Sequence, residues 1–155
     1  DNGKKIGYNS DCYGFEMSLR PMLKPHHTAA LILGTGGASK AVEYVLKKLH
    51  ISYQYVSRKK AAHTITYDEL NAANYLQKHT IIINTTPVGM YPNEDAAPPI
   101  NYEEIKEHFL LYDLVYNPEE TQFLKLGKAN GAQTKNGLEM LYLQAERSWQ
   151  IWNSL

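Results

Sequence analysis

The stretch "LILGTGGASKA", residues 31–41, constrains the fold of this chain more than any other feature. It begins in an apolar run, residues 28–34, that has the length and composition of a buried strand. Three glycines follow within four residues, and apolar side chains then recur at helical spacing up to residue 49. The stretch therefore predicts a buried strand, a tight glycine turn and an amphipathic helix, in that order.

A turn of this kind suits a phosphate group. Gly34 permits the tight bend, Gly36 and Gly37 let backbone N–H groups approach a diphosphate, and the helix N-terminus adds a favourable dipole. Ser39 stands where a third glycine or an alanine is usual. A glycine-rich turn can also be only a turn, but its place between a strand and a helix favours dinucleotide binding. The residues expected to contact the dinucleotide here are Gly34, Thr35, Gly36, Gly37 and Ala38.

The rest of the chain alternates in the same way. Further strands are predicted within residues 52–57, 80–86 and 109–116, and helices within 11–24, 66–76, 123–131 and 137–153. Unbroken apolar strands that alternate with helices indicate a parallel sheet covered on both faces. We therefore expect one domain over residues 1–155, a Rossmann-like three-layer α/β/α sandwich with a mainly parallel sheet. The helices 11–24 and 137–153 flank this core repeat.

The end of the second strand bears on the choice of dinucleotide. NAD-binding domains carry Asp or Glu there to bind the ribose 2′-hydroxyl, whereas this chain has Ser57, Arg58, Lys59 and Lys60. Three cations with no carboxylate among them suit a 2′-phosphate, although basic loop tips are also common as solvated surface. We expect NADP rather than NAD, with Ser57, Arg58 and Lys59 as contacts.

The segment "NTTPVGM", residues 84–90, follows the third predicted strand. Ligands of open α/β sheets bind at the carboxyl ends of the strands, so Asn84, Thr85, Thr86 and Val88 are expected to line the ribose and nicotinamide. The alternative is an ordinary loop shaped by its proline and glycine.

Composition excludes several other classes. Sixteen basic residues balance sixteen acidic ones, which argues against nucleic-acid and membrane partners. The lone Cys12 fits a reducing, cytoplasmic setting. The six histidines show no metal-ligand spacing and are expected at the surface or in loops, so no metal site is predicted.

Six motifs in order resemble the shikimate dehydrogenase family, over essentially the whole chain. They are "GYNSDCYG", "GTGGASKA", "VSRKK", "INTTPVGM", "DLVYNP" and "NGLEMLYLQAERSWQIW". The resemblance implies the C-terminal NADP-binding domain of an oxidoreductase that reduces 3-dehydroshikimate to shikimate with NADPH, in aromatic amino acid biosynthesis. The first motif departs from the family pattern at Ser10, which replaces threonine, and at Cys12, which replaces glycine.

The resemblance also assigns residues. Asp11 is implied as a catalytic and substrate-binding carboxylate, with a helix N-cap as its alternative role. Tyr116 and Gln144 are implied as substrate contacts, and Leu114 and Gly137 as neighbours of the nicotinamide.

The family's substrate domain, with its carboxylate-binding serines and its catalytic lysine, is not found in these residues, so we expect the chain alone to turn over little substrate. Two other interpretations stay open: a quinate/shikimate dehydrogenase that uses NAD, and a non-catalytic nucleotide-binding module. A homodimer is also open.

Overall fold

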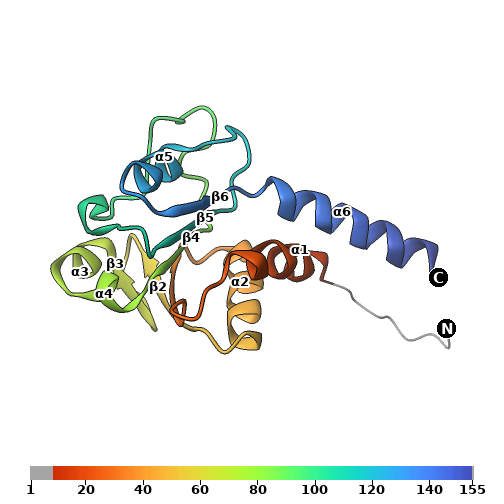
Figure 1. Ribbon diagram of the computed structural model, residues 1–155, viewed down its shortest axis with the longest axis horizontal. Coiled ribbons are helices and arrows are strands. Elements are labelled where there is room, and N and C mark those ends of the chain that lie inside the picture. The colour runs from red at the N-terminus through yellow and green to blue at the C-terminus, as the bar shows by residue number, and fades with distance from the viewer. Residues whose placement is uncertain (1–8, 155) are drawn as a thin grey trace.

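The computed structural model describes residues 9–154, and its centre is a parallel sheet (Figure 1). The sheet has six strands in the order β3-β2-β1-β4-β5-β6, and each neighbouring pair is parallel. This is the strand order of a dinucleotide-binding sheet. The order in which strands are added along the sheet reverses between β1 and β4, while all strands stay parallel. The strands are β1 (Ala29–Leu33), β2 (Ser52–Ser57), β3 (Thr64–Thr66), β4 (Ile81–Asn84), β5 (Leu110–Asp113) and β6 (Gln133–Lys135).

Helices cover both faces of the sheet, which confirms the expected three-layer sandwich (Figure 1). Alternate residues of β1 serve the two layers: Ala30 and Ile32 belong to one buried cluster, and Leu31 and Leu33 to the other. The first cluster takes residues from α1 (Ser10–Leu19), α2 (Gly37–Lys48) and α6 (Leu138–Asn153). The second takes residues from α3 (Tyr67–Ala72), α4 (Tyr75–Lys78) and α5 (Gln122–Ala129).

Two of the strands, β3 and β6, are absent from the sequence prediction. Each is three residues long and lies at an edge of the sheet. The sequence of β6 is Gln-Thr-Lys, and all three residues are only partly buried. Strands this short and polar carry no apolar run, so the signal that predicted the four central strands is missing.

The first helix differs from its expected range of 11–24. Helix α1 ends at Leu19 and continues as a 3₁₀ turn over Arg20–Met22, where Pro21 is accommodated at its start. At its other end, the Asn9 side chain accepts hydrogen bonds from the backbone N–H groups of Asp11 and Cys12. Asn9 is therefore the N-cap, and the alternative role of Asp11 as the cap is wrong. Gly7 and Tyr8 of the first motif lie outside the described residues.

Helix α6 packs against α1 with its first half and then extends away from the sheet (Figure 1). The two helices approach closely at Gly14, where a Cβ atom would lie 2.5 Å from the Met140 carbonyl oxygen. An apolar stripe runs along α6, but two of its residues, Trp149 and Trp152, are 70% and 80% exposed. The stripe consists of Leu138, Leu141, Ala145, Trp149 and Trp152. The stripe is thus a surface of the described structure rather than part of its core.

No helix within residues 9–154 combines the length and apolar character that a membrane crossing requires.

His27 lies in a loop, as expected, but it is buried rather than at the surface. Its Nδ1 accepts a hydrogen bond from the Lys24 backbone N–H at 3.0 Å, so the ring proton lies on Nε2, which donates to the His108 carbonyl oxygen at 3.1 Å. Both nitrogens are thus used by a neutral imidazole. Burial lowers the pKa of His27, and the hydrogen bond to His108 opposes this shift only in part.

Because the folded state favours neutral His27, stability should fall when this ring is protonated. The folded-state pKa lies below the unfolded value of about 6.5, so the contribution is present above this unfolded value and is lost as the pH falls through the lower folded-state pKa. Urea unfolding of the wild type and of His27→Asn across this range should give a shallower pH slope for the variant. Equal slopes would show that His27 does not titrate differently on folding.

Candidate functional site

A cavity of about 510 Å³ opens at the carboxyl ends of the strands, beside the junction of β1 and β4. In open α/β sheets this is where the connections diverge and ligands bind. Three segments that follow β1, β2 and β4 form most of its wall. Its lining includes nine of the residues expected at the cofactor: Gly34, Thr35, Gly36, Ser57, Arg58, Lys59, Thr85, Thr86 and Val88.

The glycine turn is shaped for close approach. Gly34 has a φ of 100°, and a Cβ atom there would lie 2.7 Å from Thr86 Cγ2. Gly36 and Gly37 face open space, with no atom within 4 Å of where a Cβ would be. Helix α2 begins after Gly36 with no side chain capping its first N–H groups. The turn therefore leaves both the space and the donors that a diphosphate needs. Gly37 and Ala38 lie in the exposed first turn of α2 and are not part of the cavity wall.

The basic tip after β2 divides its cations between two directions. Ser57 Oγ donates to the Lys59 carbonyl oxygen at 2.7 Å and accepts from the Lys59 N–H at 3.2 Å, which closes a tight turn. The side chains of Arg58 and Lys59 line the cavity and make no ion pair with any residue of 9–154. Lys60 instead pairs with Glu69 at 2.6 Å. Lys60 is thus not among the cations that line the cavity, because a carboxylate from outside residues 57–60 holds it.

Asn84 is fully buried and does not line the cavity. Its Nδ2 donates to Asp113 Oδ1 at 3.0 Å and to the Val88 carbonyl oxygen at 3.3 Å. Its Oδ1 accepts from the Thr86 N–H at 3.1 Å and from the Thr86 hydroxyl at 2.6 Å. The expected direct contact from Asn84 is therefore corrected: every polar atom of the side chain is used within the protein, and Asn84 holds the loop that carries Thr86 and Val88.

Asp113 is the other half of this buried pair. Its carboxylate also accepts from the Val115 N–H at 3.0 Å and from the Thr121 hydroxyl at 2.6 Å. Burial raises the pKa of Asp113 to about 6, and the hydrogen bonds from Thr121, Val115 and Asn84 hold it from rising further. The nearest polar partners thus stabilise the carboxylate, while burial disfavours its charge.

A second hollow of about 430 Å³ adjoins the first, because Thr85, Thr86 and Pro87 line both. Leu114 and Tyr116, at the end of β5, form its other side. Tyr116 is 46% exposed, so the residue is accessible to a ligand. Leu114 and Tyr116 therefore lie beside the wall of the first cavity. The resemblance placed Leu114 beside the nicotinamide and Tyr116 at the substrate.

Four residues of the first cavity were missed by the sequence analysis: Val56, Tyr67, Pro87 and Pro99. Tyr67 is the first residue of α3, and burial raises its pKa to about 12. Tyr67 directly follows β3. Because β3 has no sequence signal, the position of Tyr67 at the site could not be predicted. Pro87 stands within the predicted motif, which was the available signal for it.

Within residues 9–154, no group of three or more His, Cys, Asp or Glu side chains is arranged to hold a metal ion.

No protein-family model matches the chain. Curated relatives do. The shikimate dehydrogenase (NADP(+)) of Methanococcus aeolicus is 38% identical over an alignment of 168 positions that covers 100% of this chain and 60% of that protein. The enzyme of the same name from Clostridium beijerinckii is also 38% identical, over 98% of this chain and 58% of that protein. This chain is a homologue of the shikimate dehydrogenases. It spans about three fifths of the length of these relatives.

Solved structures agree with this relationship. A chorismate mutase/shikimate 5-dehydrogenase fusion protein from Clostridium acetobutylicum is 35% identical, with a TM-score of 0.82 over 96% of this chain and 57% of that one. A shikimate dehydrogenase in complex with NADP⁺ is 32% identical, with a TM-score of 0.77 over 100% of this chain and 59% of that one. A quinate dehydrogenase from Corynebacterium glutamicum in complex with NAD is 22% identical and shows the shared fold alone.

The remaining residues that the shikimate dehydrogenase resemblance singled out lie where α1 crosses α6. Asp11 is exposed in the first turn of α1. Gln144 is half-buried, and its Cγ lies 2.8 Å from where a Cβ of Gly14 would be. Gln144 therefore packs on the helix that carries Asp11, three residues before Gly14. Both side chains stand outside the two hollows described above.

Gly137, the last of the shikimate dehydrogenase positions, joins α6 to the sheet. A Cβ atom there would lie 2.1 Å from the Leu114 carbonyl oxygen, and the Gly137 N–H donates to the Val115 carbonyl oxygen at 3.2 Å. Gly137 is the N-cap of α6, and Asn136 Oδ1, one residue earlier, accepts from the Leu138 N–H at 3.1 Å. Glycine is needed here because the backbone of Leu114 occupies the space of a side chain.

We predict that Asp113→Asn flattens the acid part of the stability profile. A folded pKa of about 6 lies above the unfolded value of about 3.9, so this carboxyl group costs stability as the pH rises from about 4 to about 6, by up to about 3 kcal/mol. Asparagine keeps the acceptor for Asn84 and offers a donor to Thr121. Chemical denaturation across this range should show no such loss in the variant, whereas the exposed Asp95→Asn should behave as wild type.

We further predict that Gly137→Ala destabilises the fold by about 2 kcal/mol, since its methyl group would force Leu114 and α6 apart. Gly37→Ala is the matched control, because its methyl group would meet open space. Denaturation midpoints of the two variants test the difference. Equal midpoints would mean that α6 can shift at no cost.

Proposed function

We propose that this chain is the C-terminal, NADP(H)-binding part of a shikimate dehydrogenase. The observation that carries the proposal is the cavity at the strand ends, with Arg58 and Lys59 at its rim and no acidic residue in its wall. NAD-specific domains place a carboxylate at that point, and a 2′-phosphate requires cations instead. The curated relatives named above carry NADP(+) in their names, which supports the same choice.

The residues of the cavity suggest how the dinucleotide is held. Backbone N–H groups at Gly36 and the start of α2 face the diphosphate, and Arg58 and Lys59 face the 2′-phosphate. Thr85, Thr86 and Val88 lie towards the nicotinamide end, where the two hollows meet. When bound, the reduced cofactor supplies a hydride to a ketone.

The substrate side is completed elsewhere. We propose that Tyr116 and Gln144 bind 3-dehydroshikimate or shikimate, that Asp11 positions a substrate hydroxyl and assists proton transfer, and that Leu114 packs behind the nicotinamide. The remaining groups would come from the part of the relatives' length that this chain does not span. On this basis we expect little turnover from the chain alone.

The exposed stripe of α6 offers a place for that part. Trp149 and Trp152 project large apolar surfaces from a helix that stands clear of the sheet (Figure 1). Exposed apolar patches of this kind mark interaction sites. We propose that the substrate-binding part packs there. A homodimer through the same stripe is the competing arrangement, and the mass of the chain in solution separates the two.

Two rival functions are less well supported. A quinate dehydrogenase that uses NAD would gain nothing from Arg58 and Lys59 at the cavity rim. A non-catalytic nucleotide-binding module would not need Asp11, Tyr116 and Gln144. The cofactor preference tests the first of these rivals.

Calorimetric titration with NADP⁺ and NAD⁺ should show a preference for NADP⁺ in the wild type. Arg58→Ala should weaken NADP⁺ binding roughly tenfold or more and leave NAD⁺ binding nearly unchanged, because only the 2′-phosphate contact is lost. Lys125→Ala, which removes an exposed cation outside the cavity, is the control. Equal affinity for both dinucleotides would contradict the NADP proposal, and absence of binding would contradict a cofactor site contained in this chain.

A further inference from the structure

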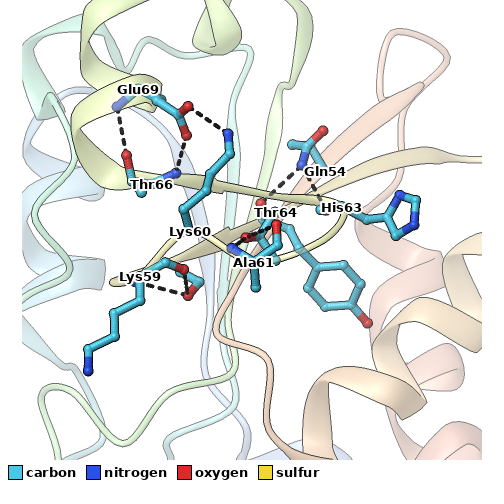
Figure 2. Close-up of polar contacts among 10 residues, drawn as sticks. Gln54, Lys59, Lys60, Ala61, His63, Thr64, Thr66 and Glu69 are labelled. Atoms are coloured by element: carbon cyan, nitrogen blue, oxygen red, sulfur yellow. Dashed lines mark hydrogen bonds and ion pairs between the residues drawn. The ribbon is translucent and has the colours of Figure 1, made fainter.

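Two adjacent lysines at the tip after β2 point in different directions (Figure 2). Lys59 extends from the Ser57 turn as part of the cavity wall. Lys60 turns towards α3, where its Nζ donates to Glu69 Oε1 at 2.6 Å. Lys60 therefore pairs with a carboxylate and does not line the cavity.

Glu69 is held in place by its own helix. Its Oε2 accepts from the Thr66 N–H at 2.7 Å, and its N–H donates to Thr66 Oγ1 at 3.2 Å, the two bonds of a capping box (Figure 2). One carboxylate oxygen thus caps α3 while the other binds Lys60. The hydrogen bond from Lys60 is the leading cause that lowers the pKa of Glu69. The carboxylate is a fixed negative charge at the N-terminus of α3.

The backbone around Lys60 is also held. The Ala61 N–H donates to Thr64 Oγ1 at 2.9 Å, and Gln54 Nε2 donates to the His63 carbonyl oxygen at 3.2 Å (Figure 2). These bonds tie the tip to β2 and β3 without using Lys60. Its ammonium group is therefore not required to keep the loop in shape.

Glu69 is tied to the cavity wall through Thr66: Thr66 pairs with Ser57 across β2 and β3, and both Ser57 and Tyr67, the residue after Thr66, line the cavity. An uncompensated carboxylate near the 2′ position favours NAD and repels a 2′-phosphate. Charges separated by less than the Debye length, about 8 Å at physiological salt, still interact. The ion pair with Lys60 removes this repulsion.

We propose that Lys60 is a specificity-determining residue that acts through Glu69: by neutralising that carboxylate, it lets Arg58 and Lys59 receive a 2′-phosphate, although it does not line the cavity itself. This inference rests on the proposed function, since it presupposes that the cavity binds NADP. An exposed pair of this kind contributes little to folding, so its loss should change cofactor choice more than stability.

The test is a set of NADP⁺ and NAD⁺ titrations on the wild type, Lys60→Gln, Glu69→Gln and the double variant. Glutamine at 69 keeps an acceptor for the Thr66 N–H and so preserves the cap. Lys60→Gln should weaken NADP⁺ binding by about threefold to tenfold and leave NAD⁺ within about twofold. Glu69→Gln should bind NADP⁺ at least as well as the wild type, and the double variant should match Glu69→Gln.

Control variants and a salt titration show whether the effect comes from the charge of Lys60. Lys60→Arg should retain the preference for NADP⁺, and the loss in Lys60→Gln should shrink as salt is raised. Lys128→Gln breaks a pair with Glu120 of similar exposure that lies outside this cavity, so it should leave both affinities unchanged. Thermal melts should show all these variants folded.

The outcomes distinguish a failure of the Lys60 inference from a failure of the proposed function. If the wild type prefers NADP⁺ but Lys60→Gln retains that preference, the inference fails and the proposed function stands. If the double variant binds NADP⁺ as weakly as Lys60→Gln, Lys60 contacts the phosphate directly and does not act through Glu69. If the wild type shows no preference for NADP⁺, the proposed function and this inference fail together.

Discussion

The buried pair of Asn84 and Asp113 is the contact on which the candidate site depends. It joins the last residues of β4 and β5 beneath the surface of both hollows. Asn84 holds the backbone and hydroxyl of Thr86, and Asp113 binds the Thr121 hydroxyl at the start of α5. One polar network therefore fixes the loop that the two hollows share and the helix behind it. A buried network of this kind is stable only when its groups are satisfied, which explains why none of its polar atoms is left for a ligand.

The fold follows from the sequence where burial is complete. Strands β1, β4 and β5 are continuous apolar runs because both faces of each strand are covered, so these runs predicted them correctly. Strands β3 and β6 are set by pairing with a neighbour at the sheet edge, an interaction between distant residues that leaves no local pattern. The start of α1 was missed for a different, local reason. Its cap is Asn9 rather than Asp11 because cap geometry depends on where the chain enters the helix, which composition does not specify.

Some residues of the candidate site could also be predicted from the sequence, and others could not. Glycine and clustered cations reveal themselves by residue type, so Gly34, Gly36, Arg58 and Lys59 could be placed at the cavity from sequence alone. The direction of Lys60 could not, because it depends on Glu69, nine residues later across a strand that was not predicted. Asn84 shows the converse error. A polar residue at a strand end resembles a ligand contact, and only its complete burial shows that it supports the loop instead.

The two sides of the candidate site are built with different interactions, so they differ in how well they tolerate amino-acid substitutions. On the proposed substrate side, α6 meets Leu114 at Gly137 and α1 at Gly14, where backbone touches backbone or side chain with no room for a methyl group. Changes there must move whole helices. On the proposed cofactor side, hydrogen bonds from Gln54, Ser57 and Thr64 hold the tip after β2, and its charged side chains lie at the surface. Such a tip can exchange one cation or carboxylate for another at little cost in stability, since exposed ion pairs contribute little to folding. Cofactor preference is therefore the property of this fold that a single substitution can most readily alter, while the geometry around Asp11 and Gln144 stays fixed by the packing of the helices that carry them.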